Sequence, residues 1–356
     1  MESKVVLVYS NKYLGHKPPI NHPERPARIN IAYEALRTYD LVEHVTIVEP
    51  RRAHVNDLLK VHSEDYIRNI EATSRSSVGF LDGDTYVVHD TYDVALYAVG
   101  GVLEAIDRML KGKTKKAFAL VRPPGHHAGV RGRALNAPSL GFCIFNNVAI
   151  AARYLQDRGY KKIVIVDIDV HHGNGTQEIF QEDNTVLYIS LHQDPETLYP
   201  GTGYSNEIGV GEGEGYTINI PLPPGSSDDV YKIAFEEIVR PIIEEFAPNF
   251  LLISAGYDAY LADPLGDLNV STEGYKMIFK TLCELSNKYC NGRVLAVLEG
   301  GYSAGLAKGF PTTIATMGGV DLKIDEPTTS RSSILNKAKA VIDEIKHVLG
   351  GYWKLT

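Results

Sequence analysis

The stretch IVIVDIDVHHGNG, residues 163–175, places two Asp and two His residues at the end of an otherwise apolar run. Near-continuous hydrophobicity over 163–170 is typical of a strand in a parallel sheet that is buried on both faces. Charged groups in such surroundings are unfavourable unless a metal ion or hydrogen-bonding partners compensate them. The stretch therefore predicts a buried strand that ends in a binding site.

Five other apolar runs predict further strands of the same sheet, at 5–9, 117–121, 186–191, 250–256 and 294–301. Segments with helical periodicity lie between them, at 93–110, 147–160, 228–246 and 271–289. This alternation predicts an α/β fold with a doubly wound, mostly parallel central sheet flanked by helices. Because no linker interrupts the pattern, the sequence predicts a single domain over residues 1–356.

Polar clusters follow five of these strands, which in an open α/β sheet is where ligands bind. The clusters are RPPGHHAG (122–129), DVHHGNG (169–175), SLHQDPETLYPGTG (190–203), AGYDAYLADPLGDL (255–268) and EGGYSAG (299–305). We therefore expect all five to meet at one edge of the sheet.

The residues after the central strand are suited to bind a divalent cation. Strand alternation would point Asp167, Asp169 and His171 to the same side, and Asp258 could supply a further ligand. One His with two carboxylates leaves positions open for water and substrate, which is typical of a catalytic zinc site. A lone Asp-x-His is more often a strand-end cap and a hydrogen-bonded histidine. That reading does not account for His126, His127, His172 and Asp258 at the ends of other strands.

Composition narrows the function classes. A formal net charge of −8, with no basic run longer than KTKK (113–116), predicts no direct nucleic-acid binding and favours a cationic substrate. Three widely spaced cysteines without a CxxC motif fit a reducing compartment. The apolar run at 5–9 is too short for a signal peptide or membrane span, so we expect a cytoplasmic protein without membrane association. A homo-oligomer remains open.

Taken together and in order, these motifs resemble the histone deacetylase superfamily, which includes acetylpolyamine amidohydrolases and related prokaryotic amidohydrolases. The resemblance covers most of the chain, and HHGNGTQ and LEGGY are most similar to the class II branch. It implies an arginase/deacetylase-like fold and zinc-dependent hydrolysis of N-acyl, mainly acetyl, amides of lysine side chains or polyamines. The motifs are HPERPARI (22–29), DGDTY (82–86), RPPGHHA (122–128), GFCIFNNVAIAA (141–152), DIDVHHGNGTQ (167–177), YPGTG (199–203), GYDAYLADPLGDL (256–268) and LEGGY (298–302).

The resemblance also implies roles for individual residues. Asp169, His171 and Asp258 would bind one Zn²⁺. His127 would act as general base and acid, and His126 as its electrostatic partner. Asp167 would orient His126, and the neutral Asn174, where other members carry Asp, would be the partner of His127. Tyr302 would donate a hydrogen bond to the carbonyl oxygen of the scissile amide.

Further residues match the substrate channel and a second cation site. Gly141, Phe142 and Tyr199 would wall a slot for an acylated lysine or polyamine arm, with Tyr199 standing where Phe is frequent. Asp84 would lie at the rim, and Arg25 would line an internal cavity, although a surface salt bridge is equally consistent with Arg25. Ser190 and Leu191, with Asp167 and the backbone of Asp169 and His171, match a monovalent-cation site for K⁺.

Two other functions remain open from the sequence. A ureohydrolase of the same fold would need two metal ions, but GYDAY lacks a second Asp two residues after Asp258, which favours one metal ion. A non-catalytic module that binds acyl-lysine would need none of the catalytic groups, and Tyr302 with the His pair argues against it.

Overall fold

A sheet of eight parallel strands forms the centre of the computed structural model, which describes residues 4–355. The spatial order is β10-β9-β8-β11-β12-β5-β1-β2, and each neighbouring pair is parallel. The strands are β1 (Val5–Val8), β2 (Val45–Val48), β5 (Lys116–Ala119), β8 (Ile163–Asp167), β9 (Val186–Gln193), β10 (Thr217–Leu222), β11 (Phe250–Ala255) and β12 (Val294–Leu298). The predicted parallel α/β sheet is confirmed, whereas residues 1–3 and 356 of the predicted domain lie outside the described residues.

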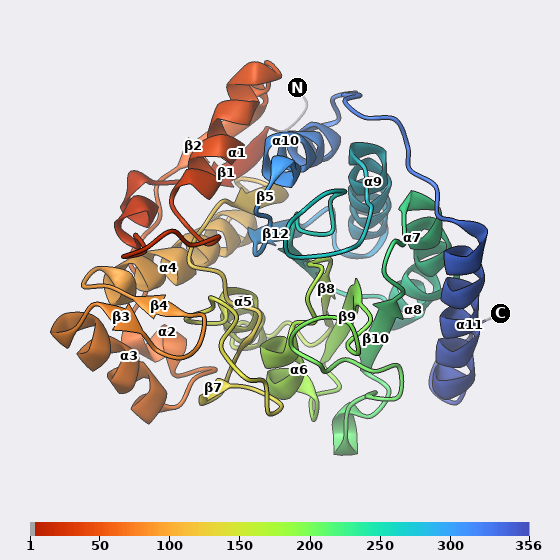
Figure 1. The fold of residues 1–356 in the computed structure, drawn as a ribbon, viewed down its shortest axis with the longest axis horizontal. Coiled ribbons are helices and arrows are strands. Elements are labelled where there is room, and N and C mark those ends of the chain that lie inside the picture. Colours follow the sequence, from red (N-terminus) through yellow and green to blue (C-terminus); the bar gives the residue numbers. More distant parts are fainter. Residues whose placement is uncertain (1–3, 356) are drawn as a thin grey trace.

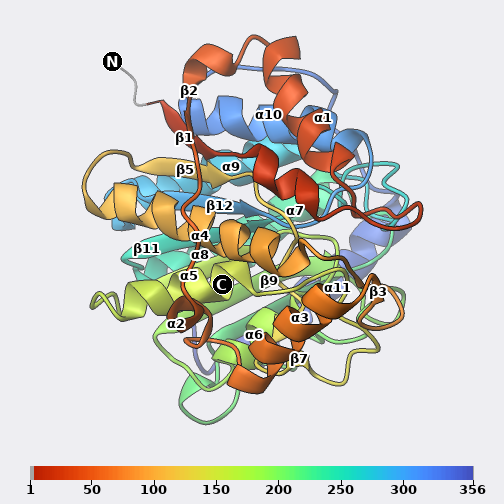
Figure 2. The same ribbon diagram turned by 90° about the vertical axis from the view of Figure 1, so that its left-hand side faces the viewer.

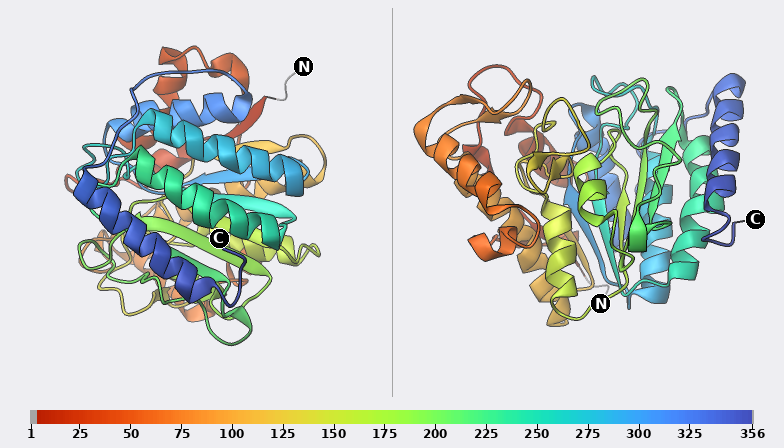
Figure 3. Two further views of the ribbon diagram at one scale, coloured as in Figure 1. Left: turned by 90° about the vertical axis from the view of Figure 1, so that its right-hand side faces the viewer. Right: turned by 90° about the horizontal axis from the view of Figure 1, so that it is seen from below.

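Helices cover both faces of this sheet, as a doubly wound fold requires (Figure 1). Those facing the viewer in Figure 2 include α2 (Val55–Leu58), α3 (Glu64–Ser76), α4 (Thr91–Leu110) and α5 (Asn147–Gln156). The opposite layer, seen on the left of Figure 3, contains α7 (Asp228–Ala234), α8 (Arg240–Phe246), α9 (Thr272–Tyr289), α10 (Ala304–Gly318) and α11 (Ser332–Leu349). Two further helices, α1 (Ala27–Thr38), which packs on α10, and α6 (Asn174–Phe180), complete the layers.

The main differences from the sequence prediction are two edge strands and one helix. The edge strands β2 and β10 were not predicted, because edge strands lack a continuous apolar run: β2 exposes its two central residues, and β10 contains Pro221. The predicted helix 228–246 forms as α7 and α8, joined by a π-helical turn over Phe235–Val239. Two short hairpins, β3 (Gly79–Phe80) with β4 (Tyr86–Val87) and β6 (Ala128–Gly129) with β7 (Gly132–Arg133), lie outside the main sheet.

The core strands of this sheet are fully buried, as their composition predicts. Every residue of β8, β11 and β12 is buried, and their apolar side chains belong to one hydrophobic core that reaches both helix layers. Within residues 4–355 there is no helix whose length and apolar character would let it cross a bilayer.

Candidate metal centre and active site

A cavity of about 260 Å³ opens where β5, β8, β11 and β12 end. Each of these strands is followed by a polar loop, and parallel strands bring such loops to the same edge of the sheet. The residues from the sequence analysis that line this cavity are Asp84, His126, His127, Gly141, Phe142, Asp169, His171, Tyr199 and Tyr302.

Asp169, His171 and Asp258 converge beside this cavity. One ligand atom of each lies within 4.8 Å of the others, and His171 Nδ1 is 3.1 Å from Asp169 Oδ1 and 3.4 Å from Asp258 Oδ2. Asp258 Oδ2 is buried and has no hydrogen-bond partner among the described residues. Burial and the neighbouring Asp169 carboxylate raise the pKa of Asp258 to about 6. Two carboxylates, an imidazole and an unsatisfied buried oxygen fit a divalent cation such as zinc.

The loop after β8, rather than strand alternation, brings these ligands together. The strand ends at Asp167, three residues before the predicted end. The loop is then fixed by carboxylates: Asp169 Oδ1 accepts from the backbone N–H of His171 at 2.9 Å, and Asp258 Oδ1 accepts from Val170 N–H at 2.9 Å. The prediction that Asp167, Asp169 and His171 point to the same side assumed a strand that continues to residue 171. Of these three residues, only Asp167 lies in β8.

Gly300 closes the site from the β12 side. Its N–H donates to Asp169 Oδ2 at 2.7 Å, and a Cβ at this position would lie 1.9 Å from Asp258 Oδ2. Only glycine lets the backbone approach both carboxylates this closely.

The two adjacent histidines have different partners. His126 Nδ1 lies 3.0 Å from Asp167 Oδ2, whereas His127 Nδ1 lies 2.7 Å from the amide oxygen of Asn174. Burial lowers the pKa of His126, but the carboxylates of Asp167 and Asp169 outweigh it and raise this pKa to about 10. Burial and the neighbouring His126 hold the pKa of His127 well below its ordinary value. The arrangement thus favours a charged His126 beside a neutral His127.

Aromatic residues form the walls of the cavity. The ring of Tyr199 meets that of His127 edge to face, with centroids 4.9 Å apart, and Phe142 meets Tyr302 in the same way at 5.8 Å. Asp84 lies at the cavity with both carboxylate oxygens accepting hydroxyl donors, from Thr85 and Ser139. Burial raises the pKa of Asp84.

Arg25 borders a separate cavity rather than this one, so its expected place at an internal cavity stays a prediction. Its side chain is exposed, lies 3.3 Å from Asn21 Oδ1, and borders a separate cavity of about 290 Å³ on the other side of Tyr302. The buried arginine of this segment is Arg28, which donates to the carbonyl oxygens of Gly301 and Glu299 and lies 4.7 Å from the ring centroid of Tyr302. Arg25 precedes α1, whereas Arg28 is in its first turn and faces the loop after β12.

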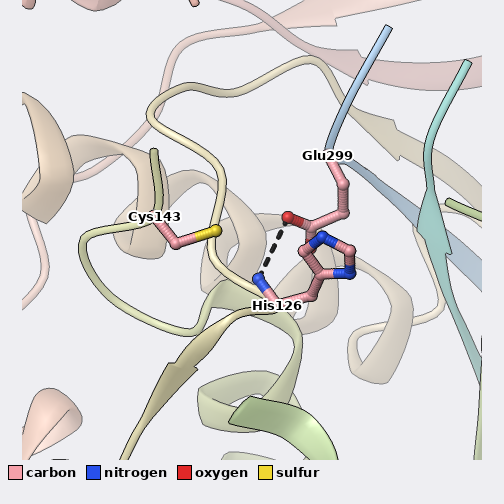
Figure 4. Close-up of side chains that lie close together, drawn as sticks. All are labelled: His126, Cys143 and Glu299. Atoms are coloured by element: carbon pink, nitrogen blue, oxygen red, sulfur yellow. Dashed lines mark hydrogen bonds between the residues drawn. The ribbon is translucent and has the colours of Figure 1, made fainter. Parts of the chain in front are cut away.

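Glu299 is a site residue that sequence reasoning missed. It is fully buried, and its Oε2 accepts the backbone N–H of Gly125 at 2.8 Å. The same oxygen accepts the backbone N–H of His126 at 3.2 Å (Figure 4). Burial raises its pKa to about 7. His126, Cys143 and Glu299 also bring possible ligand atoms within 4.8 Å of one another, but Glu299 already holds the histidine loop. The signal was present: LEGGY places a Glu directly after an apolar strand, as VDIDV places Asp167.

Other predicted residues have structural partners. His172 is buried, with Nδ1 2.8 Å from Thr202 Oγ1 and Nε2 2.9 Å from Gln177 Oε1, so it is a hydrogen-bonded histidine. Ser190 lies opposite Asp167 in the pairing of β8 with β9, and Leu191 follows it. These backbones adjoin the loop that carries Asp169 and His171.

Comparison with known proteins identifies the family that carries this site. A profile described as histone deacetylase domain matches residues 22–317. The chain belongs to the histone deacetylase family. A probable deacetylase of Archaeoglobus fulgidus is 42% identical to it over 98% of both chains. Histone deacetylase 14, chloroplastic, of Arabidopsis thaliana is 39% identical, covering 83% of this chain and 73% of that protein.

Solved structures agree with this assignment. The crystal structure of the HDA15 HD domain superposes on this histone deacetylase family member with a TM-score of 0.89 and 35% identity, covering 99% of this chain and 96% of that chain. The resemblance drawn from the sequence motifs is confirmed, and the family supports deacetylase-type amide hydrolysis.

Proposed function

We propose that this protein is a zinc-dependent amidohydrolase that removes acyl groups, mainly acetyl, from lysine side chains or polyamines. One observation carries the proposal: three residues that could hold a metal ion and a pair of differently partnered histidines meet at one aromatic-walled cavity. A narrow apolar cavity that ends in polar groups suits an extended methylene arm with an amide at its tip. The proposal treats residues 1–356 as one catalytic domain in the cytoplasm.

Asp169, His171 and Asp258 would hold the zinc ion, whose chemistry is to polarise the amide carbonyl and make water more acidic. The K⁺ site belongs to the same proposal: backbone oxygens of Asp167, Asp169, His171 and Leu191, with Ser190, would hold that ion behind the triad. It would stabilise a loop whose carboxylates otherwise repel one another.

The two histidines have different roles. His127 keeps its Nδ1 on the neutral Asn174, so its other ring nitrogen is free to take a proton from the attacking water and pass it to the leaving amine. His126, held by Asp167, places a positive charge beside the reacting oxygen. A neutral acceptor on His127 and an anionic one on His126 keep these roles separate.

Tyr302 and the cavity walls complete the proposed mechanism. The Tyr302 hydroxyl would donate to the oxygen that becomes negative as water attacks, while Arg28 holds the loop that carries it. Phe142, Tyr199 and Gly141 would enclose the methylene arm, and Asp84 would accept a donor from the substrate at the mouth.

The test uses purified wild-type protein loaded with zinc, an acetyl-lysine peptide and an acetylpolyamine, with acetate release and bound metal measured together. We expect about one zinc ion per chain and turnover of at least one substrate. Asp169→Ala and Asp258→Ala should lose both zinc and activity, because a site with three protein ligands cannot spare one. Full zinc and activity in both variants would refute the ligand assignment.

Two other outcomes would replace the proposal. About two metal ions per chain would favour a ureohydrolase-type enzyme, although Tyr260, at the position of the second carboxylate, donates its hydroxyl to Asp325 at 2.8 Å. Binding of acetyl-lysine peptides without release of acetate would favour a non-catalytic binding module.

A further inference from the structure

One wall of the cavity, residues 139–142, is tied at both ends to neighbouring segments. The Ser139 hydroxyl donates to the Asp84 carboxylate, and the Ser139 carbonyl accepts the Tyr199 hydroxyl at 2.9 Å. At the other end, the Phe142 N–H donates to Thr85 Oγ1 at 3.0 Å. Between them, Leu140 N–H donates to Asp82 Oδ2 at 2.7 Å. The 82–85 turn, the 139–142 wall and Tyr199 therefore form one hydrogen-bonded unit.

This wall holds an unfavourable backbone conformation. Gly141 and Phe142 both adopt the left-handed region, at φ +55° and φ +69°. A bulky residue such as Phe rarely adopts this conformation, which persists only where the surroundings impose it. The hydrogen bond from Phe142 N–H to Thr85 and the two bonds at Ser139 supply that constraint.

The same wall packs so closely against His127 that no further side-chain atom fits between them. A Cβ added at Gly141 would lie 2.4 Å from His127 Cδ2 and 2.9 Å from Tyr199 Cε1. The Tyr199 ring is thus packed between this wall and the two histidines His127 and His171, at 4.9 and 6.1 Å between ring centroids. Because the Tyr199 hydroxyl is bonded to Ser139, the ring cannot withdraw without breaking that bond.

We propose that Ser139 and Tyr199 are specificity-determining positioning residues, whose hydroxyl groups fix the width of the cavity so that it takes an unbranched methylene arm and rejects a wider one. This rests on the proposed function, because it concerns the arm of the same substrate. This gives the Tyr199 hydroxyl, which a Phe would lack, a function: its hydrogen bond to the Ser139 carbonyl holds the channel wall in place. Preorganisation of this kind lowers the cost of ordering the wall around a bound arm.

The kinetic test compares Ser139→Ala and Tyr199→Phe with the wild type. Ser139→Ala removes the bond to Asp84 but keeps the carbonyl that Tyr199 uses, and Tyr199→Phe does the reverse. The substrates are one peptide with Nε-acetyl-lysine and the same peptide with acetylated 4-aminomethyl-phenylalanine, whose arm is wider. We expect the kcat/KM preference for the linear arm to fall about tenfold in each variant, mainly through KM.

Matched controls remove a hydroxyl elsewhere. Tyr154→Phe loses a 2.8 Å bond to Asp107, and Ser226→Ala loses a 2.7 Å bond to the Pro223 carbonyl, both away from the cavity. Both should keep the wild-type preference. The proposal is overturned if the preference is unchanged in Ser139→Ala and Tyr199→Phe, if the controls lose it equally, or if the wild type accepts both arms alike.

A second measurement needs no turnover. Hydrogen exchange of the 139–143 amides in the substrate-free protein should be about tenfold faster in Ser139→Ala and Tyr199→Phe than in the wild type or the controls. Unchanged exchange would show that the two hydroxyls do not hold the wall. The wild type could hydrolyse no acylated amine while the amides of both variants exchange faster as expected. The proposed function would then be wrong, but the finding that the two hydroxyl groups hold the wall would remain.

Discussion

At the scale of single residues, Tyr302 offers the sharpest test of the chemistry. Its ring packs against Phe142 and Arg28, so Tyr302→Phe should preserve that packing and remove only the hydroxyl. We expect zinc content and folding to be kept and kcat to fall by about two orders of magnitude, the loss typical of one oxyanion donor. The measurement is kcat on an acetyl-lysine peptide beside metal analysis. An unchanged kcat would remove Tyr302 from the mechanism.

Asp84 is the residue that should separate recognition from chemistry. Its carboxylate faces the cavity and retains lone pairs beyond those used by Thr85 and Ser139. We expect Asp84→Asn to lower kcat/KM for an acetyl-lysine peptide or acetylpolyamine more than tenfold, about 1.4 kcal/mol. A small neutral acetanilide should be affected much less.

The pattern of the Asp84→Asn result is informative in each case. Equal slowing on both substrates would show that Asp84 acts through folding of the 82–85 turn. No slowing on either would place substrate recognition in another loop.

At the scale of elements, Glu299 joins the loop after β12 to the loop after β5 that carries the histidines. Its Oε2 accepts two backbone N–H groups, so Glu299→Ala would leave both without a partner in a buried place. We expect the free energy of unfolding to fall by about 3 kcal/mol, as for two buried donors left unsatisfied. Urea unfolding measures this, and kcat should fall with it because His126 loses its support.

Glu299→Gln is the matched control, because its amide oxygen can still accept both N–H groups. We expect its stability to stay within about 1 kcal/mol of the wild type, as when a hydrogen bond is retained. An equal loss in Glu299→Gln and Glu299→Ala would show that the charge of Glu299, rather than its role as acceptor, stabilises the loops.

At the scale of the whole molecule, a buried ionic cluster around Glu24 connects the N-terminal segment to the site. The Glu24 carboxylate accepts from Arg122 Nε at 2.8 Å and Nη2 at 2.6 Å, from Arg28 Nη1 at 3.3 Å and from the Tyr86 hydroxyl at 2.8 Å. Arg122 begins the segment that leads to His126, and Arg28 holds the loop of Tyr302. The segments on both sides of the cavity are therefore stabilised through the Glu24 carboxylate.

We expect Glu24→Gln to lower the free energy of unfolding at pH 7 by about 3–5 kcal/mol, because it leaves Arg122 and Arg28 buried without their counter-ion. Burial opposes ionisation of Glu24, but Arg122 holds its pKa well below the usual value. A depressed pKa stabilises the fold above the unfolded pKa of about 4.3, and this contribution is lost as the pH falls below it. The difference between wild type and Glu24→Gln in urea unfolding should therefore shrink from pH 7 to pH 3. A constant difference would contradict the ionic account.

Sequence by itself determined the central strands and the residues at their ends. Strands such as β8 and β11 are buried on both faces, so their apolar runs are continuous, and a charge within the next three residues stands out, as at Asp169 and Asp258. The local pattern is sufficient to predict these strands and strand ends because the apolar run and the charge that follows it are adjacent in the sequence. The edge strands β2 and β10 were not predicted, because their burial depends on partners from elsewhere in the chain.

Only the tertiary structure decided which of these groups touch. Arg25 and Arg28 are three residues apart in the sequence, but Arg25 precedes α1 and is exposed, whereas Arg28 lies in the first turn of α1 and donates to the carbonyl of Gly301. Ser139 gives no signal in its own segment, because its partners Asp84 and Tyr199 are 55 and 60 residues away. Such contacts depend on how separate loops pack, which periodicity along the chain does not encode.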